Sequence, residues 1–208
     1  MLAYILTAIL AYAIGSIMSS VIISRKMAGF DVREKGSKNA GSTNMLRTVG
    51  KRAAILTLVC DVLKGVLAIL LAMAIAKIAK LENAILLKYI AGFFAILGHT
   101  FPIFFEFRGG KGVATALGVL LMLNWKIGLI CLIFALILMA ITRIVSVGSI
   151  LAAVLYPVLV IFFGINNNIL VILMSVLIAA LVIFNHRTNI KRLREGTENK
   201  LSFSKTKD

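Results

Sequence analysis

Two polar stretches of the sequence combine residue types that suit phosphate binding. The first, GSKNAGSTNMLR (36–47), intersperses glycines with small hydroxyl or amide side chains and basic residues. Glycines allow the positive φ angles that turn successive backbone N–H groups toward one point, and Ser, Thr and Asn add short donors around the same concavity. The stretch predicts an anion site with the phosphate-binding candidates Asn39, Gly41, Thr43 and Asn44.

The second stretch, FEFRGGKGVAT (105–115), places three glycines around Lys111 immediately before an apolar run. Exposed amides at a helix N-terminus, together with a lysine, form an anion site. Neither Lys51 nor Lys111 completes the pattern G-x-x-x-x-G-K-[ST], so the loop does not indicate ATP binding. The binding candidates in this stretch are Gly109, Gly110 and Gly112.

Composition indicates the elements that must position these two stretches. Apolar residues make up 61% of the 208-residue chain, whereas soluble domains are roughly half apolar. A transmembrane helix needs about 20 mostly apolar residues, and the longest run, 113–142, is divided by a polar and aromatic group at 124–126 that suits a membrane interface. We predict an all-α, polytopic membrane protein with one membrane-embedded domain (1–208). Its spans are expected at about 1–23, 53–76, 89–105, 113–123, 127–142, 147–163 and 169–184.

The basic residues orient these seven spans. Segments 25–52 and 186–208 hold eight and seven Lys or Arg, and only an odd number of spans places both on one face, as the positive-inside rule prefers. We expect seven transmembrane helices, the N-terminus outside and a cytoplasmic C-terminal tail (186–208). The net charge of +15 also suits anionic lipid headgroups. Nucleic-acid binding is disfavoured, because no binding module is recognisable.

Further polar residues fall on the cytoplasmic face. His99 lies toward the cytoplasmic end of the third span, and His186, Asn189 and Arg192 are spaced so that a helical continuation places them on one side. Alone, each polar loop is more typical of a plain turn, but two loops and these groups on one face favour a binding site. The turn between the fifth and sixth spans adds Arg143, Ser146 and Ser149.

Other reactive side chains within the spans are interpreted structurally. Asp61 and Lys64 form an i, i+3 pair of opposite charge, which we interpret as a brace for the loops in preference to a catalytic pair. Cys60 and Cys131 lack metal-ligand spacing and are interpreted as packing residues. No acidic cluster offers a metal site, and no cofactor is expected.

Four blocks of the sequence resemble the cytoplasmic signature blocks of the bacterial acyl-phosphate:glycerol-3-phosphate acyltransferases, the PlsY family. In order they read GSKNAGSTNMLRTVG, GHTFPIFFEFRGGKGVAT, TRIVSVGSI and HRTNIKRLREGTE, and the apolar segments between them match over essentially the whole chain. Two departures are GSIMSS where the family usually has GSIP, and Lys38 where Gly is common. Their effects are left open.

The resemblance implies transfer of a fatty acyl group from acyl phosphate to the 1-hydroxyl of glycerol-3-phosphate, giving lysophosphatidic acid and phosphate. This is the first acylation step of phospholipid synthesis, at the cytoplasmic face of the bacterial plasma (inner) membrane. A functional link to the enzyme that supplies acyl phosphate, the acyl chain length and the oligomeric state are left open. The catalytic residues implied by the resemblance are Ser37, Arg47, Lys111, His186 and Asn189.

The sequence is compatible with two catalytic bases and with more than one class of function. A substrate phosphate is our hypothesis for the base, because its second pKa near 6 leaves it largely dianionic at neutral pH. His99 is the rival base, and which loop holds which phosphate is undetermined. The alternative function is a transporter of phosphorylated metabolites, but transport usually places polar residues near the bilayer midplane and often uses inverted repeats. CDP-alcohol phosphotransferases need clustered aspartates, which this sequence lacks.

Overall fold

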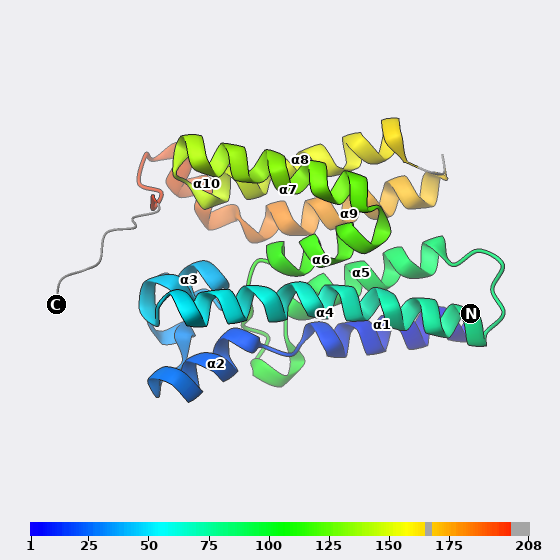
Figure 1. Cartoon of the computed structure of the whole chain (residues 1–208), viewed down its shortest axis with the longest axis horizontal. Helices are drawn as coiled ribbons and strands as arrows, with labels where there is room; N and C mark the ends of the chain where they lie inside the picture. Colours follow the sequence, from blue (N-terminus) through cyan, green and yellow to red (C-terminus); the bar gives the residue numbers. More distant parts are fainter. Residues whose placement is uncertain (165–167, 201–208) are drawn as a thin grey trace.

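The computed structural model describes residues 1–164 and 168–200. Within these ranges the chain forms helices and no strands, which confirms the all-α prediction (Figure 1). The last eight residues of the predicted tail lie outside the described residues. The helices are α1 (Leu2–Gly15), α2 (Ser19–Ala28), η1 (Val32–Glu34), α3 (Ser42–Thr48), α4 (Lys51–Ile78), α5 (Ile85–Thr100), η2 (Ile103–Phe105), α6 (Val113–Leu123), α7 (Trp125–Thr142), α8 (Val145–Phe163), α9 (Ile169–Asn185) and α10 (Arg187–Arg194).

Five helical segments in the described ranges are long and apolar enough to cross a membrane. A sixth candidate is α9 taken together with α10, although the two helices are bent by 58°. The remaining apolar helix, α6, has 11 residues and is therefore about 16 Å long, roughly half the thickness of a hydrocarbon core. The chain is a multi-pass membrane protein with five to six candidate spans by length and composition. The five are Leu2–Ala28, Lys51–Ile78, Ile85–Phe105, Trp125–Thr142 and Val145–Phe163.

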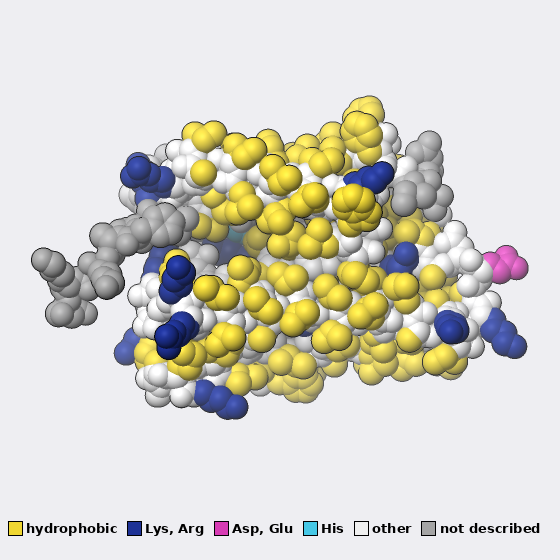
Figure 2. Space-filling view, viewed as in Figure 1, with side chains coloured by type: hydrophobic (Ala, Val, Ile, Leu, Met, Phe, Trp, Pro, Cys, Tyr) yellow, Lys and Arg dark blue, Asp and Glu magenta, His cyan; other side chains and the backbone are white. Residues whose placement is uncertain are grey.

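The long helices run roughly side by side along one axis (Figure 1). Helices α1, α4 and α5 pack on one another, α7 and α9 pack on α8, and α6 lies between the two groups against α4 and α7. The short helices α2, α3 and α10 gather at the end of the bundle opposite the N-terminus. Apolar side chains cover the sides of the visible face, and Lys and Arg lie mainly toward the two ends (Figure 2).

Glycines permit the closest contacts between the packed helices. A Cβ added at Gly15 of α1 would lie 2.1 Å from the carbonyl oxygen of Ala95 in α5, and one at Gly118 of α6 would lie 2.1 Å from that of Val62 in α4. Lipid tails are as apolar as the helix surfaces, so helix association in a membrane depends on this kind of close packing. The glycines therefore fix α5 and α6, the helices on either side of the second polar loop.

A buried ion pair connects α4 to the break between α1 and α2. The Lys64 ammonium lies 3.1 Å from the Asp61 carboxylate, and both side chains are at most 5% exposed. Ser19 donates a hydrogen bond to the same carboxylate oxygen (3.0 Å), and the Lys64 ammonium donates to the carbonyl oxygen of Ile17 (3.0 Å). The charges are thus paired and hydrogen-bonded, as burial requires. This geometry fits the bracing role predicted for the pair.

Candidate active site

A cavity of about 420 Å³ lies between the two helix groups, near the end of the bundle that carries α3 and α10. Figure 2 shows the hollow between α4 and α7, with Lys or Arg and His side chains within it. Its mouth is polar and its depth apolar. The predicted site residues that line it are Ser37, Asn39, Gly41, Thr43, Asn44, Arg47, His99, Lys111, Gly112, Ser146, Ser149, His186, Asn189 and Arg192. Three predicted residues, Gly109, Gly110 and Arg143, do not line it.

Asn44 organises the first polar loop. Its side-chain nitrogen donates to three carbonyl oxygens at 3.0–3.1 Å, those of Val32, Lys35 and Asn39. Its side-chain oxygen accepts from the backbone N–H of Ser37 at 2.9 Å. An amide nitrogen has two hydrogens to donate, so the side chain is fully occupied within the loop. The Asn44 side chain therefore shapes the loop that presents its neighbours, and the structure gives no support to its predicted contact with phosphate.

The first two glycines of the second loop also have a different role from the one predicted. The amides of Gly109 and Gly110 donate to the carbonyl oxygens of Thr100 and His99, each at 3.1 Å. A Cβ at Gly109 would lie 2.0 Å from the His99 carbonyl oxygen, and one at Gly110 would lie 2.2 Å from His99 Nε2. These glycines let the loop pack against the end of α5, and their amides are not free for an anion.

Gly112 and Lys111 complete the second loop at the cavity. Gly112 precedes α6 with a φ of 83°, a left-handed conformation that favours glycine. Burial lowers the Lys111 pKa to about 8; Glu198 opposes this shift, and Arg192 and Arg47 reinforce it. Lys111 is therefore mostly protonated at neutral pH and loses its charge as the pH rises through about 8.

The turn after α7 divides its predicted residues between the surface and the cavity. Arg143 ends α7 with a φ of 60°, is exposed and does not line the cavity, so the structure gives no support to its predicted contact with substrate. The next helix, α8, begins at Val145 and buries Ser146 and Ser149 on the side that lines the cavity. A left-handed residue at the end of a helix reverses the chain direction, which separates Arg143 from the two serines.

Glu198 is a site residue that sequence reasoning missed. Its carboxylate accepts hydrogen bonds from Ser146 Oγ (3.0 Å), Asn189 Nδ2 (2.5 Å) and Arg192 Nε (2.7 Å). Burial raises its pKa, but the hydrogen bonds from Arg192, Asn189 and Ser146 outweigh burial and lower it. Ser146, Asn189 and Arg192, which were predicted to contact substrate, thus donate hydrogen bonds to a carboxylate of the protein itself. A sequence signal existed, since Glu198 is one of only eight acidic residues and follows a basic helix.

His186 lies directly after α9, with its ring inside the cavity. Its Nδ1 is 2.8 Å from the Val182 carbonyl oxygen. A carbonyl oxygen only accepts, so Nδ1 carries the hydrogen and Nε2 of the neutral ring is an acceptor. Burial, and then the charge of Lys111, lower the His186 pKa to about 4. The ring is therefore neutral at pH 7 and can accept a hydrogen bond from a substrate hydroxyl.

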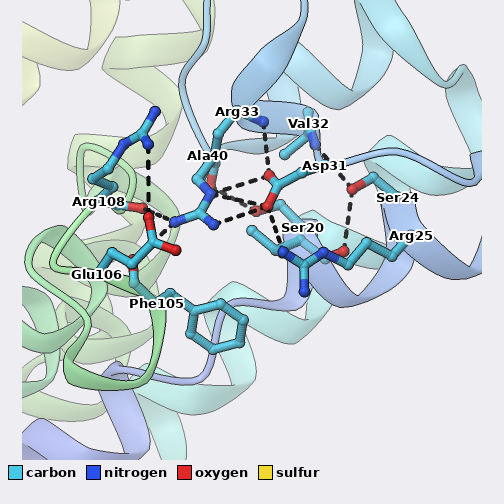
Figure 3. A network of polar contacts seen from close by, with 11 residues as sticks. Ser20, Ser24, Arg25, Asp31, Val32, Arg33, Ala40, Phe105, Glu106 and Arg108 are labelled. Atoms are coloured by element: carbon cyan, nitrogen blue, oxygen red, sulfur yellow. Dashed lines mark hydrogen bonds and ion pairs between the residues drawn. The ribbon is translucent and has the colours of Figure 1, made fainter.

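A second network, also missed at the sequence level, holds the two polar loops together (Figure 3). The Arg33 side chain, 7% exposed, pairs with Asp31 at 2.8 Å and donates to the carbonyl oxygens of Phe105 (2.8 Å) and Arg108 (3.3 Å). Arg25 pairs with the same carboxylate at 2.9 Å. Burial raises the Asp31 pKa, but hydrogen bonds from Arg33 and Arg25 outweigh it and hold the pKa at about 2. Arg33 therefore connects the segment before the first polar loop to the second loop.

Metal binding has no support in the part of the chain that the structure describes. Residues 1–164 and 168–200 contain no group of three or more His, Cys, Asp or Glu side chains placed to hold an ion. The cavity offers hydrogen-bond donors and cations, a donor set suited to anions.

The architecture and the site can be compared with known proteins. A family model described as glycerol-3-phosphate acyltransferase matches residues 5–196. The chain belongs to the glycerol-3-phosphate acyltransferase family. Glycerol-3-phosphate acyltransferase of Clostridioides difficile (strain 630) is 43% identical over 97% of both chains. The protein of that name from Methylococcus capsulatus (strain ATCC 33009 / NCIMB 11132 / Bath) is 44% identical over 92% of both.

Solved structures of a glycerol-3-phosphate acyltransferase share the fold. The crystal structure of PlsY (YgiH), an integral membrane glycerol 3-phosphate acyltransferase, in its glycerol 3-phosphate form superposes with a TM-score of 0.85 at 36% identity, covering 96% of each chain. Its lysophosphatidic acid form gives a TM-score of 0.83 at 33% identity, covering 96% of this chain and 95% of that one. The predicted membership of the PlsY family is confirmed, and the transporter alternative is not favoured.

Proposed function

We propose that the protein transfers a fatty acyl group from acyl phosphate to the 1-hydroxyl of glycerol-3-phosphate, giving lysophosphatidic acid and inorganic phosphate. The observation that carries the proposal is a single cavity with a cationic, hydrogen-bonding mouth and apolar walls in its depth. A small phosphorylated alcohol matches the first part and a fatty acyl chain matches the second. The likeness to a structure named for its glycerol 3-phosphate form supports the same acceptor.

The free positive charge at the mouth supports phosphate binding. Among the described residues, Arg47 and Lys111 have no carboxylate within salt-bridge distance, whereas Arg192 is paired with Glu198 at 2.7 Å. Two unpaired cations beside hydroxyl and amide side chains bind phosphate by charge-assisted hydrogen bonds. Ser37, His186 and Asn189 line the same mouth. We assign these five residues to glycerol-3-phosphate and to the reacting carbonyl.

The chemistry needs positioning more than it needs a strong base. The 1-hydroxyl oxygen attacks the acyl carbon, the bond from that carbon to the phosphate oxygen breaks, and phosphate leaves with its electron pair. The neutral His186 Nε2 accepts a hydrogen bond from the 2-hydroxyl of glycerol-3-phosphate and so orients the substrate, which leaves the proton of the 1-hydroxyl for a dianionic substrate phosphate. Arg47 and Lys111 offset the negative charge that develops on the leaving phosphate.

His99 is a weaker base in this arrangement. Its Nδ1 is 3.7 Å from the Asp61 carboxylate, beyond hydrogen-bond reach, and its ring is 2% exposed beneath Gly110. A general base must come within about 3 Å of the hydroxyl that it deprotonates. We therefore assign the proton to the substrate phosphate and a packing role to His99.

The proposed topology has seven membrane segments, with α6 crossing about half of the bilayer. The N-terminus is outside, and the end with α2, α3 and α10 faces the cytoplasm of a bacterial plasma (inner) membrane. The support is the gathering of basic loops with the cavity mouth at this end (Figure 1). The site is then open to water-soluble glycerol-3-phosphate and, between α4 and α7, to lipid-soluble acyl phosphate.

The test mixes purified protein with palmitoyl phosphate and glycerol-3-phosphate and follows phosphate release. Palmitoyl-CoA replaces palmitoyl phosphate as the control donor, and Arg143→Ala, at an exposed cation outside the cavity, is the control for Lys111→Ala. We expect turnover with acyl phosphate only. The turnover rate should fall at least about a hundred-fold in Lys111→Ala and stay nearly unchanged in Arg143→Ala. Turnover with palmitoyl-CoA alone would overturn the proposed donor.

A further inference from the structure

The apolar part of the cavity ends at a similar depth on four helices. On each helix the lining residues start near the polar mouth and stop eight to eleven residues further along. At 1.5 Å per residue this is a depth of about 12–17 Å. The four runs are 112–120 into α6, 131–139 on α7, 145–156 on α8 and 178–186 at the end of α9.

The floor of this apolar part is closed by buried side chains. The walls combine alanines with larger residues such as Leu117, Leu132 and Met139, and the alanines leave space between the helices. At the floor, Leu120, Cys131, Tyr156 and Ile178 are all at most 8% exposed. Tyr156, 3% exposed, is the largest of the four, and all four belong to one cluster of buried apolar residues. The wall alanines are Ala116, Ala135, Ala152, Ala153 and Ala179.

One side of the cavity borders the lipid. Leu58 of α4 and Leu136 of α7 line the cavity and are 43% and 55% exposed. Figure 2 shows the hollow between these two helices. An acyl chain can therefore enter sideways from the bilayer, while its far end meets the closed floor. The depth of about 15 Å equals half of a hydrocarbon core of about 30 Å, the reach of the chains in one leaflet.

We propose that Tyr156 forms the end stop that limits the length of the acyl chain the enzyme accepts. This inference rests on the proposed function, because it assigns the apolar walls to the chain of the acyl phosphate. A chain longer than the cavity must bend out between α4 and α7 or displace the tyrosine ring. Either change weakens binding of the acyl phosphate in the orientation in which it reacts. A larger wall residue shortens the usable depth in the same way.

The experiment compares kcat/KM for lauroyl, palmitoyl and arachidoyl phosphate within each variant, so that the ratio between donors is insensitive to the amount of folded enzyme. Tyr156→Ala deepens the cavity, and we expect the arachidoyl-to-palmitoyl ratio to rise at least about ten-fold, the effect of one or more methylenes in an apolar pocket. Tyr156→Phe keeps the ring and is expected to keep the wild-type ratio. Tyr156→Leu serves if the alanine variant does not fold.

Ala152→Phe tests the opposite direction. It fills the cavity wall, and we expect the palmitoyl-to-lauroyl ratio to fall at least about ten-fold. The matched control is Val154→Phe on the same helix, because Val154 is 47% exposed and does not line the cavity. Active variants with unchanged donor ratios would overturn the end stop and leave the proposed function intact. Absence of turnover with every acyl phosphate in the wild-type protein would instead overturn the proposed function.

Discussion

Replacing Arg33 by methionine removes the side chain that holds the two polar loops together. Asp31 would lose a partner at 2.8 Å but keep Arg25 at 2.9 Å, and the carbonyl oxygens of Phe105 and Arg108 would lose their donor. Breaking a buried ion pair costs about 3–5 kcal/mol, and a hydrogen bond from a charged group contributes about 1.5–3 kcal/mol. Because Arg25 remains, we expect the lower end, a loss of about 3 kcal/mol in the free energy of unfolding.

The same change is expected to affect catalysis through Lys111, which lies three residues beyond Arg108 on the loop that Arg33 anchors. Denaturant unfolding in detergent measures the stability of the variant. Its KM for glycerol-3-phosphate reports on the position of the loop, and we expect the displaced loop to raise this KM about ten-fold. Arg25→Met is the matched control: its side chain is 59% exposed, so the loss should be below about 1 kcal/mol. Equal effects of the two variants on stability and KM would refute the reasoning.

Three further predictions concern the cavity mouth. The KM for glycerol-3-phosphate should rise as the pH passes about 8, because deprotonation removes the Lys111 charge; a profile identical in Lys111→Arg would contradict this. Gly110→Ala should cost at least about 2 kcal/mol of stability and most activity, because its Cβ would lie 2.2 Å from His99 Nε2; thermal unfolding measures this against Ala114→Gly. His99→Ala should retain measurable turnover with an unshifted pH profile, and complete inactivity in folded protein would favour His99 as the base.

The spacing of polar and apolar residues in the sequence predicts much of the helical architecture. Lys111 and His186 lie far apart in the chain, yet the number of apolar runs between them predicts that both lie on the same face of the membrane. The break at Asn124 also had a local signal: its side chain accepts from the backbone N–H groups of Lys126 and Ile127 and so begins α7. Such signals depend on neighbours in the sequence and are therefore visible in it.

The roles of Gly110 and Asn44 had no such local signal, and the position of Glu198 after a basic helix does not reveal its partners. Whether the backbone amide of Gly110 is free depends on how closely its loop packs against α5. Whether the side-chain nitrogen of Asn44 is free depends on three carbonyl oxygens that only the folded loop brings to it. Glu198 meets Ser146 across 52 residues of sequence. Hydrogen-bonding capacity is consumed by tertiary contacts, so residue type alone predicts a donor without predicting whether it is free to bind a ligand.

The most direct test of the account is a single-turnover reaction that quantifies both products. Purified enzyme in excess over palmitoyl phosphate is mixed with glycerol-3-phosphate, and lysophosphatidic acid is measured by mass spectrometry alongside inorganic phosphate. We predict one lysophosphatidic acid, acylated at the 1-hydroxyl, for each phosphate released, and neither product at a comparable rate in Lys111→Ala. Phosphate release without the lipid product, in correctly folded protein, would contradict it.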